Sequence, residues 1–174
     1  MSKEKFAKLR ENIGQDSVTA ILLEKLRGEA DRHLNEAVCQ YEIPDGIRLL
    51  ETSKRIQRRV AALAMAYNIF GDEKYAQAFK RQLLKWVIQT DIPKSWNGPG
   101  SAWRTIECGL RLLGSWQIAF DGFRRSPSLD DVTLLLMISS MHRQTTHLIN
   151  NPTGGNWLMM ENTLPLTGPD SMER

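Results

Sequence analysis

The hydrophobic residues of this sequence recur every three to four positions, which is the period of an amphipathic helix. We find no convincing alternation of polar and apolar residues of the kind that marks a β-strand. Helices are predicted over residues 4–13, 17–38, 46–69, 73–90, 103–123 and 129–149, with a further one beginning at 156. The pattern therefore predicts an all-α fold.

The clearest pair of helices, 46–69 and 73–90, is predicted to form a hairpin, because each carries one apolar stripe at helical spacing. The stripes consist of Ile56, Val60, Leu63, Ala64 and Tyr67 in the first helix, and of Tyr75, Ala76, Phe79, Leu83, Trp86 and Val87 in the second. Gly71 is expected to end the first helix, and Asp72 to cap the second. So short a link leaves the two helices antiparallel.

Other helix ends are marked by hydroxyl residues. Ser17 is expected to cap the second helix, and Ser128 the last long one. Asp130 and Asp131 would then lie in the first turn of that helix, where carboxylates are favourable. Between the helices, "DIPKSWNGPGSA" at 91–102 holds two Pro and two Gly and is predicted to be a long irregular loop.

Composition fits one soluble globular domain, since the 174 residues are 41% hydrophobic and 25% charged. A net charge of +3 and a pI of about 9.0 are compatible with a polyanionic partner but do not indicate one. Arg55, Arg58 and Arg59 are interpreted as a solvated helix face rather than a polyanion contact. No nucleic acid is expected as a partner.

The cysteines and the N-terminal segment narrow the class of protein further. Cys39 and Cys108 lack the spacing of a disulfide framework or a metal site and are predicted to be buried free thiols. The charged start, "MSKEKFAKLRENIG", lacks the apolar core of a secretory signal, so the sequence as written would stay in the cytoplasm, but its localisation is left open. No stretch approaches the ~20 apolar residues of a membrane span, so no membrane contact is expected.

Three parts are predicted along the chain: N-terminal helices over 1–45, a hairpin domain over 46–164, and an irregular, disordered tail over 165–174. A helical repeat is the weaker alternative. "GDEKYAQAF" resembles tetratricopeptide units, but no ~34-residue self-similarity follows it.

Several common catalytic patterns are missing from the sequence. Of its histidines, His33, His142 and His147, the last two lie five apart, which separates them on a helix, so no metal site is predicted. We find no glycine-rich phosphate loop and no nucleophile elbow. No cofactor is expected.

A first polar and aromatic cluster surrounds the start of the 103–123 helix. Trp96 and Trp103 offer planes on which sugar rings stack, and Arg104 can hold a carboxylate or sulfate through two parallel hydrogen bonds. Glu107 lies three residues after Arg104, on the same helical face. The residues alone favour the competing interpretation, in which an Arg–Glu pair braces the helix beside two core tryptophans.

A second cluster is centred on Asn156, which follows Gly154 and Gly155 at the start of a helix. The residues alone favour a helix N-cap, a position that Asn occupies well. The alternative is a neutral amide donor that, together with the helix dipole, neutralises a carboxylate. Hydrogen bonds that strengthen as enolate-like charge develops would then help to remove the proton alpha to that carboxylate.

Three stretches occur in order: "RRVAALAMAYNIFGDEKYAQAFKRQLLKW", "SAWRTIECGLRLLGSW" and "HLINNPTGGNWLMMEN". Together they resemble the N-terminal helical domain of the heparinase II/III family of polysaccharide lyases, which includes alginate lyases, over residues 47–162. The resemblance implies a partial (α/α) toroid of antiparallel helical hairpins, followed by a β-sandwich domain. It also implies β-elimination at a uronic acid of an acidic polysaccharide such as heparan sulfate or alginate.

The resemblance also assigns roles. Asn156 matches the amide that neutralises the uronate carboxylate. Glu161 would be a structural partner of this site that does not contact the substrate itself. Trp103, Arg104 and Glu107 match the family's "WR-I--G-R" helix, which would line the groove. The expected substrate-binding set is Trp96, Trp103, Arg104, Glu107 and Trp157.

The sequence departs from the family pattern near its end. The family's catalytic Tyr and His have no match here, since Tyr41, Tyr67 and Tyr75 fall in the wrong segments. Where the family continues a long apolar helix, "TLPLTGPDSMER" has prolines and a glycine that oppose one. We therefore hypothesise a truncated product, from a frameshift near residue 163, that lacks the β-sandwich and is inactive alone.

Two other functions stay open. A helical-hairpin scaffold that binds a protein or a glycan without chemistry would fold cooperatively as 174 residues. An (α/α) glycosidase would need two acids at a defined separation, for which Glu107 and Glu161 are the candidates.

Overall fold

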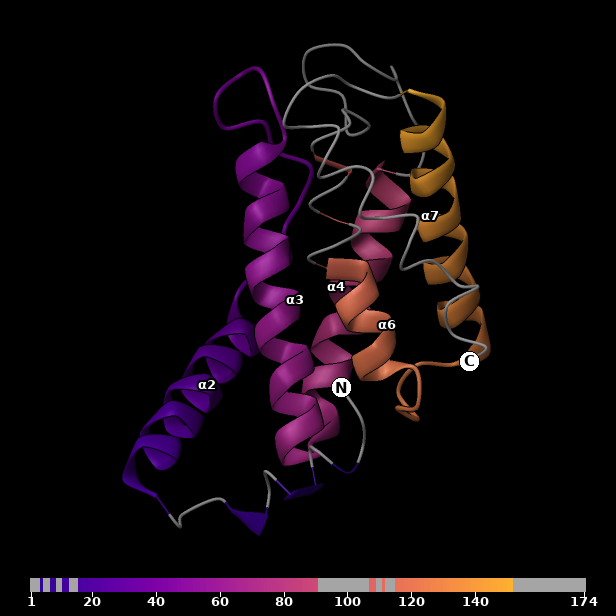
Figure 1. Ribbon diagram of the computed structural model, residues 1–174. Coiled ribbons are helices and arrows are strands. Elements are labelled where there is room, and N and C mark those ends of the chain that lie inside the picture. The colour runs from indigo at the N-terminus through magenta and orange to yellow at the C-terminus, as the bar shows by residue number, and fades with distance from the viewer. Residues whose placement is uncertain are drawn as a thin grey trace.

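The computed structural model describes residues 4, 7–8, 11–12, 16–90, 107–108, 111 and 115–151, without the side chains of 88–90. Within these residues every regular element is helical, which confirms the all-α prediction. The long elements are α2 (Ser17–Asn35), α3 (Leu50–Phe70), α4 (Glu73–Thr90), α6 (Gln117–Phe123) and α7 (Asp131–Asn150). In Figure 1, α3, α4, α6 and α7 run alongside one another, and α2 leans away at an angle. The continuation of these helices into a toroid stays a prediction, as does the division into three parts.

The α3–α4 hairpin forms as predicted, and α4 has the expected bounds. Gly71 ends α3 in the left-handed conformation (φ 72°), which glycine adopts without a Cβ clash, and its N–H donates to Tyr67 O at 2.8 Å. Asp72 then caps α4, because its carboxylate accepts from the Lys74 amide at 3.0 Å. Both predicted stripes are buried except for Tyr67, which is half-buried.

The core of the described residues is aromatic where α3, α4 and α6 meet. Phe79 and Phe123 stack with ring centroids 4.6 Å apart and planes 13° apart. Trp116 meets Phe79 edge-on at 6.3 Å, and Tyr67 lies 5.4 Å from Phe123. Such pairs add to the hydrophobic gain of burial, so this cluster fixes how α6 sits on the hairpin.

Gly122 allows α6 to approach α3 closely. A Cβ at this position would lie 3.1 Å from Ala64 Cβ and 3.0 Å from Asn68 Nδ2. The Asn68 amide uses this proximity, because it donates to Gly122 O at 3.3 Å and to Ala64 O at 2.8 Å. Within the helix predicted over 103–123, the described residues are helical: 107, 108 and 111 are α-helical, 115–116 are π-helical, and α6 follows.

Two predicted N-caps are wrong, because a neighbouring aspartate takes the position in each case. Asp16 caps α2 in place of Ser17, and accepts from the backbone amides of residues 18 and 19 at 2.9 and 3.0 Å. Asp130 caps α7 in place of Ser128, and accepts from the Thr133 amide at 2.8 Å. The Ser128 hydroxyl instead donates to Glu73 Oε2 at 2.7 Å.

The interpretation of three arginines as a solvated face is wrong for Arg59. Arg55 and Arg58 are exposed, but the Arg59 side chain is buried. Its guanidinium donates to Glu36 Oε2 at 2.8 Å, to the Ala37 carbonyl at 2.8 Å and to Gln82 Oε1 at 2.9 Å. Arg59 therefore holds the segment after α2 against α3 and α4, a role that the local sequence does not reveal.

The structure also bears on the predictions for the cysteines and for a membrane span. Cys39 and Cys108 are buried free thiols, as predicted, and burial raises the pKa of the Cys39 thiol. Among the described residues, no helix is long and apolar enough to cross a membrane. The predicted loop at 91–102 and everything after residue 151 lie outside the described residues.

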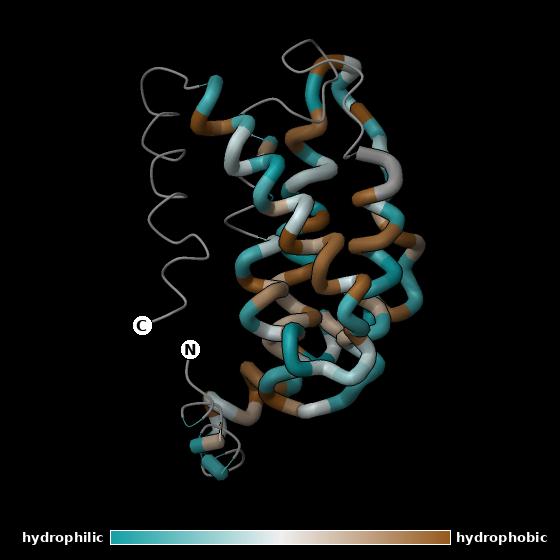
Figure 2. Tube along the Cα trace, turned by 90° about the vertical axis from the view of Figure 1, so that its right-hand side faces the viewer, coloured by the Kyte–Doolittle hydropathy of each residue, from teal (hydrophilic) through white to brown (hydrophobic). Residues whose placement is uncertain are grey.

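Hydrophobic and hydrophilic residues are intermixed along the helices, as Figure 2 shows by colour. α7 carries more exposed apolar residues than the hairpin helices, of which α3 exposes Met65. Val132 and Leu135 are 68% and 66% exposed, and Ile149 is 60% exposed. Its inward side packs on α4, so α7 has both a core face and an apolar outer stripe.

Candidate functional site

Most of the predicted site residues lie outside the described part of the chain. These are the catalytic candidate, the supporting acid and four of the substrate-binding set: Asn156, Glu161, Trp96, Trp103, Arg104 and Trp157. Their roles stay predictions. Glu107 is described and fully buried, and its proposed contact with substrate likewise stays a prediction.

A buried arginine that we did not single out lies one helical turn after Glu107. Arg111 is 1% exposed, and its guanidinium is held by partners that are far apart in sequence. It donates to Ser53 Oγ on α3 at 3.2 Å and to Gln144 Oε1 on α7 at 3.2 Å. It also donates to Cys108 Sγ at 3.3 Å. The available signal was its place as the last residue of the "WR-I--G-R" pattern.

The Arg111 network sets the rotation of α7 about its own axis. Gln144 is 1% exposed, and its amide nitrogen also donates to Ser140 Oγ at 3.0 Å, one turn earlier. A buried polar group without its partner is costly, so this face of α7 has to point inward. Arg143 and His147, which flank this inward face of α7, line a hollow at the end of the helix.

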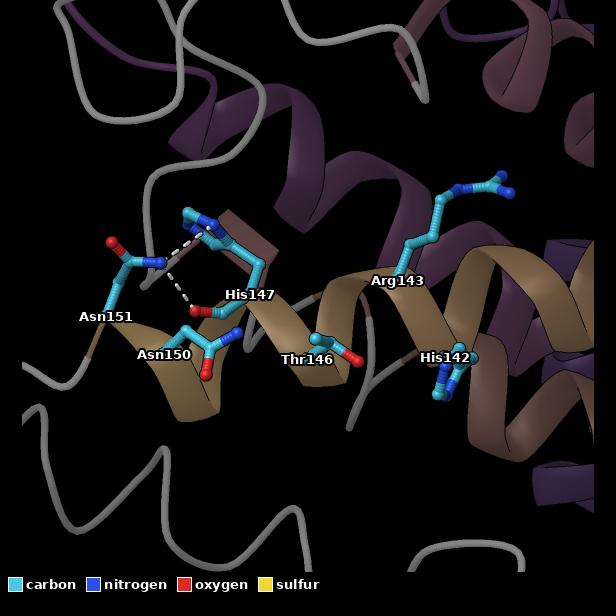
Figure 3. A pocket seen from close by; sticks show the side chains of 6 residues that line it. All are labelled: His142, Arg143, Thr146, His147, Asn150 and Asn151. Atoms are coloured by element: carbon cyan, nitrogen blue, oxygen red, sulfur yellow. Dashed lines mark hydrogen bonds between the residues drawn. The ribbon is translucent and has the colours of Figure 1, made fainter.

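A pocket of about 390 Å³ lies along the last turns of α7. The described residues that line it are His142, Arg143, Thr146, His147, Asn150 and Asn151. They form two neighbouring rows at four-residue spacing, one starting at position 142 and the other at 143. Figure 3 shows the two asparagines and His147 at the C-terminal end, and the other lining residues earlier on the helix.

The lining contains imidazole, guanidinium, amide and hydroxyl groups, and none of these six described residues is acidic. His147 is 3% exposed and forms the buried part of the wall, whereas His142, Arg143, Thr146 and Asn150 are exposed. Such a surface favours a ligand with oxygen acceptors over a metal ion. The described residues hold no cluster of three or more metal-ligating side chains.

Asn151 ends α7 and orders the neighbouring imidazole. Its Nδ2 donates to the His147 carbonyl at 2.9 Å and lies 3.2 Å from His147 Nδ1 (Figure 3). An amide nitrogen can only donate, so Nδ1 accepts and the proton of the neutral ring sits on Nε2. The contact thus selects one tautomer of His147.

Both histidines of α7, His142 and His147, line the pocket although they are not on one helical face. Five residues apart, they lie in different rows of α7, but the pocket spans both rows. The signal in the sequence was the run of polar side chains at four-residue spacing, His142, Thr146 and Asn150 beside Arg143, His147 and Asn151. A search for metal spacing does not detect it.

Comparison with known proteins places this arrangement in a family. Residues 50–168 match the family described as Heparinase II/III N-terminus. The chain belongs to this family. The match covers α3, α4, α6 and α7, hence the hairpin, the Arg111 network and the pocket, and it confirms the resemblance drawn from the sequence.

A curated relative of the chain is a heparin-sulfate lyase of Pedobacter heparinus. The two are 30% identical over 87 residues, which cover 50% of this chain and 13% of the relative. The chain thus spans only a small part of the length of this relative. No solved structure matches the chain significantly.

Proposed function

We propose that this chain forms the helical part of a lyase that cleaves a uronic-acid-containing polysaccharide by β-elimination. In that reaction the C5–H bond gives its proton to a base, its electron pair forms the C4=C5 double bond, and the C4–O bond breaks. The departing oxygen then takes up a proton. The step needs neutralisation of the uronate carboxylate, because negative charge builds up beside it as C5 loses its proton.

The observation that carries the proposal is the pocket at the end of α7. It presents donors from six described residues and lies only five residues before Asn156 in the chain. An acidic sugar bound there would be held near the start of the segment that bears the neutralising amide. Family membership and the heparin-sulfate lyase relative support an acidic polysaccharide as the substrate class.

Asn156 is assigned the neutralising role, and the base is not assigned to this chain. The family's Tyr and His have no match in these 174 residues. The chain alone is therefore expected to release no unsaturated uronate from heparan sulfate or alginate. Ultraviolet absorbance of the unsaturated ends measures this directly, and their appearance would contradict the assignment.

Two substitutions separate the proposed role of Asn156 from that of a helix cap. Asn156→Asp keeps a good cap, because Asp and Asn cap helices about equally well, but it sets a carboxylate against the uronate. We expect Asn156→Asp to weaken binding of an acidic tetrasaccharide by about tenfold or more, which corresponds to about 1.4 kcal/mol. Asn156→Ala should weaken it less. Equal affinity of Asn156→Asp and the wild type would reduce Asn156 to a cap.

A further inference from the structure

The pocket along α7 has two chemically different ends. His142 and Arg143 stand at one end, and Asn150 and Asn151 at the other. Eight residues of helix separate the ends by about 12 Å, because an α-helix rises ~1.5 Å per residue. The pocket is therefore long enough for its ends to contact different groups of one ligand.

The helix dipole makes the two ends unequal. Partial negative charge gathers on the last carbonyls of α7, and its effect fades beyond the last turn. An anionic group is therefore disfavoured beside Asn150 and Asn151, where the helix ends. Arg143 lies about two turns earlier, outside the reach of this effect. The cationic side chain thus stands where an anion is tolerated, and neutral amides stand where it is not.

The side chains at the early end are suited to an anion. Arg143 carries a guanidinium, and its Nη1 donates to Ser139 Oγ at 2.7 Å, which holds the side chain along the helix. His142 is exposed and provides an N–H donor in either charge state. Guanidinium groups bind carboxylate and sulfate through charged hydrogen bonds, which are about twice as strong as neutral ones.

From this polarity we propose that the pocket is a directional subsite for a stretch of acidic polysaccharide longer than one sugar unit. The carboxylate or sulfate of one sugar binds at Arg143, and the neutral hydroxyls of the next sugar, on the side nearer Asn156 in the chain, bind at Thr146, Asn150 and Asn151. The inference rests on the proposed function for the class of polymer, and adds the site and the orientation of the polysaccharide. It makes Arg143 the residue that distinguishes an acidic from a neutral saccharide.

The test is calorimetric titration of the full chain with three tetrasaccharides: heparan sulfate, alginate and the neutral maltotetraose. Arg143→Gln removes the charge from the pocket, and the matched control Arg58→Gln removes one from an exposed site on α3. We expect Arg143→Gln to lower the affinity for the acidic ligands about tenfold, and Arg58→Gln to change that affinity less than twofold. A chemically desulfated heparan sulfate separates sulfate from carboxylate as the bound group.

Nuclear magnetic resonance gives a readout that does not depend on affinity. The three histidines supply distinct imidazole signals, and His33 lies on α2, where it contacts Glu36 Oε2 at 2.8 Å, as an internal control. An acidic tetrasaccharide should shift the His142 signal and leave that of His33 unchanged. A shift of neither signal, or of both equally, would overturn the subsite.

The outcomes separate this proposal from the proposed function. If the wild type binds acidic tetrasaccharides and Arg143→Gln and Arg58→Gln weaken them equally, the subsite is wrong while the acidic substrate class stands. If the wild type binds no acidic tetrasaccharide, or binds maltotetraose equally well, both proposals fail. Loss of affinity in Arg143→Gln alone, with the His142 shift, supports the subsite.

Discussion

The two ends of α7 use polar side chains in opposite ways. At the turn end, formed by residues 71–73 and 124–130, carboxylates collect donors from the protein itself. Glu73 accepts hydrogen bonds from Ser126, Ser128 and Tyr67, and Asp130 lies 2.7 Å from Lys80 Nζ. At the pocket end, defined by the six lining residues, donors surround a hollow and none of the six is acidic.

The carboxylates at the turn end are held in the charged form by hydrogen bonds within the protein, which is typical of groups that stabilise a fold. Partial burial pushes the pKa of Glu73 up, but hydrogen bonds from Ser126, Ser128 and Tyr67 outweigh it and leave the pKa below its usual value. The bond from Lys80, with those from Thr133, holds the pKa of Asp130 far below its usual range. Both carboxylates are thus stabilised in the charged form by hydrogen bonds. The bonds of Glu73 join the two inter-helix turns, and the bond of Asp130 to Lys80 joins the second turn to α4.

The difference teaches how one helix can serve both stability and binding. Hydrogen bonds at the turn end form only in the folded chain, so removing them should lower stability and leave binding unchanged. Exposed residues at the pocket end contribute little to folding, so changing them should lower affinity and leave stability unchanged. Arg111 lies between these cases, because it is buried and also sets the rotation of α7.

The largest effect is expected for Arg111→Met, which removes the group that connects α7 to α3. Ser53 and Gln144 are both buried, and each would lose a charged donor. Loss of such bonds costs roughly 1–3 kcal/mol each, so we expect the free energy of unfolding to fall by about 3 kcal/mol. Denaturant titration measures this change. Arg58→Met, at an exposed site on α3, is the control and should change stability by less than about 0.5 kcal/mol.

An intermediate effect is expected for Glu73→Ala, which removes the acceptor shared by three hydroxyl groups. We expect a loss of about 2 kcal/mol, since Ser126 is buried. In thermal unfolding this corresponds to a decrease in Tm of roughly 4–8 °C for a chain of this length. Gln77→Ala, at an exposed position of the same helix, should have no such effect. Equal losses of stability in both variants would contradict a stabilising role of the Glu73 hydrogen bonds.

The same carboxylate predicts a direction of pH dependence. Because the pKa of Glu73 is lowered in the folded state, its contribution is fully present above the unfolded value of about 4.3. It is lost as pH falls through the lower, folded pKa. Glu73→Gln should therefore lose less stability than the wild type on acidification below about pH 4.

The smallest effect concerns the link of the hairpin. Gly71 has a φ of 72°, so Gly71→Ala should cost about 1 kcal/mol of stability through backbone strain. Gly28 lies within α2 with nothing within 4 Å of an added Cβ. Gly28→Ala should therefore stabilise the chain by roughly 0.5–1 kcal/mol. The same sign for both variants in thermal unfolding would contradict this account of the turn.

The hairpin could be predicted from the sequence because short-range signals determine its two helices and the link between them. The stripes of α3 and α4 and the Gly71-Asp72 link depend on residues within one turn of each other, and the structure has them as expected. The N-cap of α7 was misassigned for a non-local reason. Ser128 is a good cap by type, but its hydroxyl bonds to Glu73, 55 residues earlier, and the cap falls to Asp130.

The buried arginines were not predicted because their partners are also distant in sequence. Arg59 and Arg111 both look like surface residues in a helical pattern. Their partners lie 22–23 residues away for Arg59, and up to 58 residues away for Arg111. Only the packed fold brings these groups together. The pocket residues were visible in the sequence as two polar rows, but the hollow beside them is a property of the fold.

The most direct test of the difference between the two ends uses one variant from each. Asn150→Ala and Glu73→Ala are each measured for stability by denaturant titration and for affinity toward a heparan sulfate tetrasaccharide by calorimetry. We predict that Asn150→Ala loses affinity at unchanged stability, and that Glu73→Ala loses stability at unchanged affinity. If Asn150→Ala binds as the wild type does, or if both variants lose both properties in parallel, the pocket end of α7 is not a binding site.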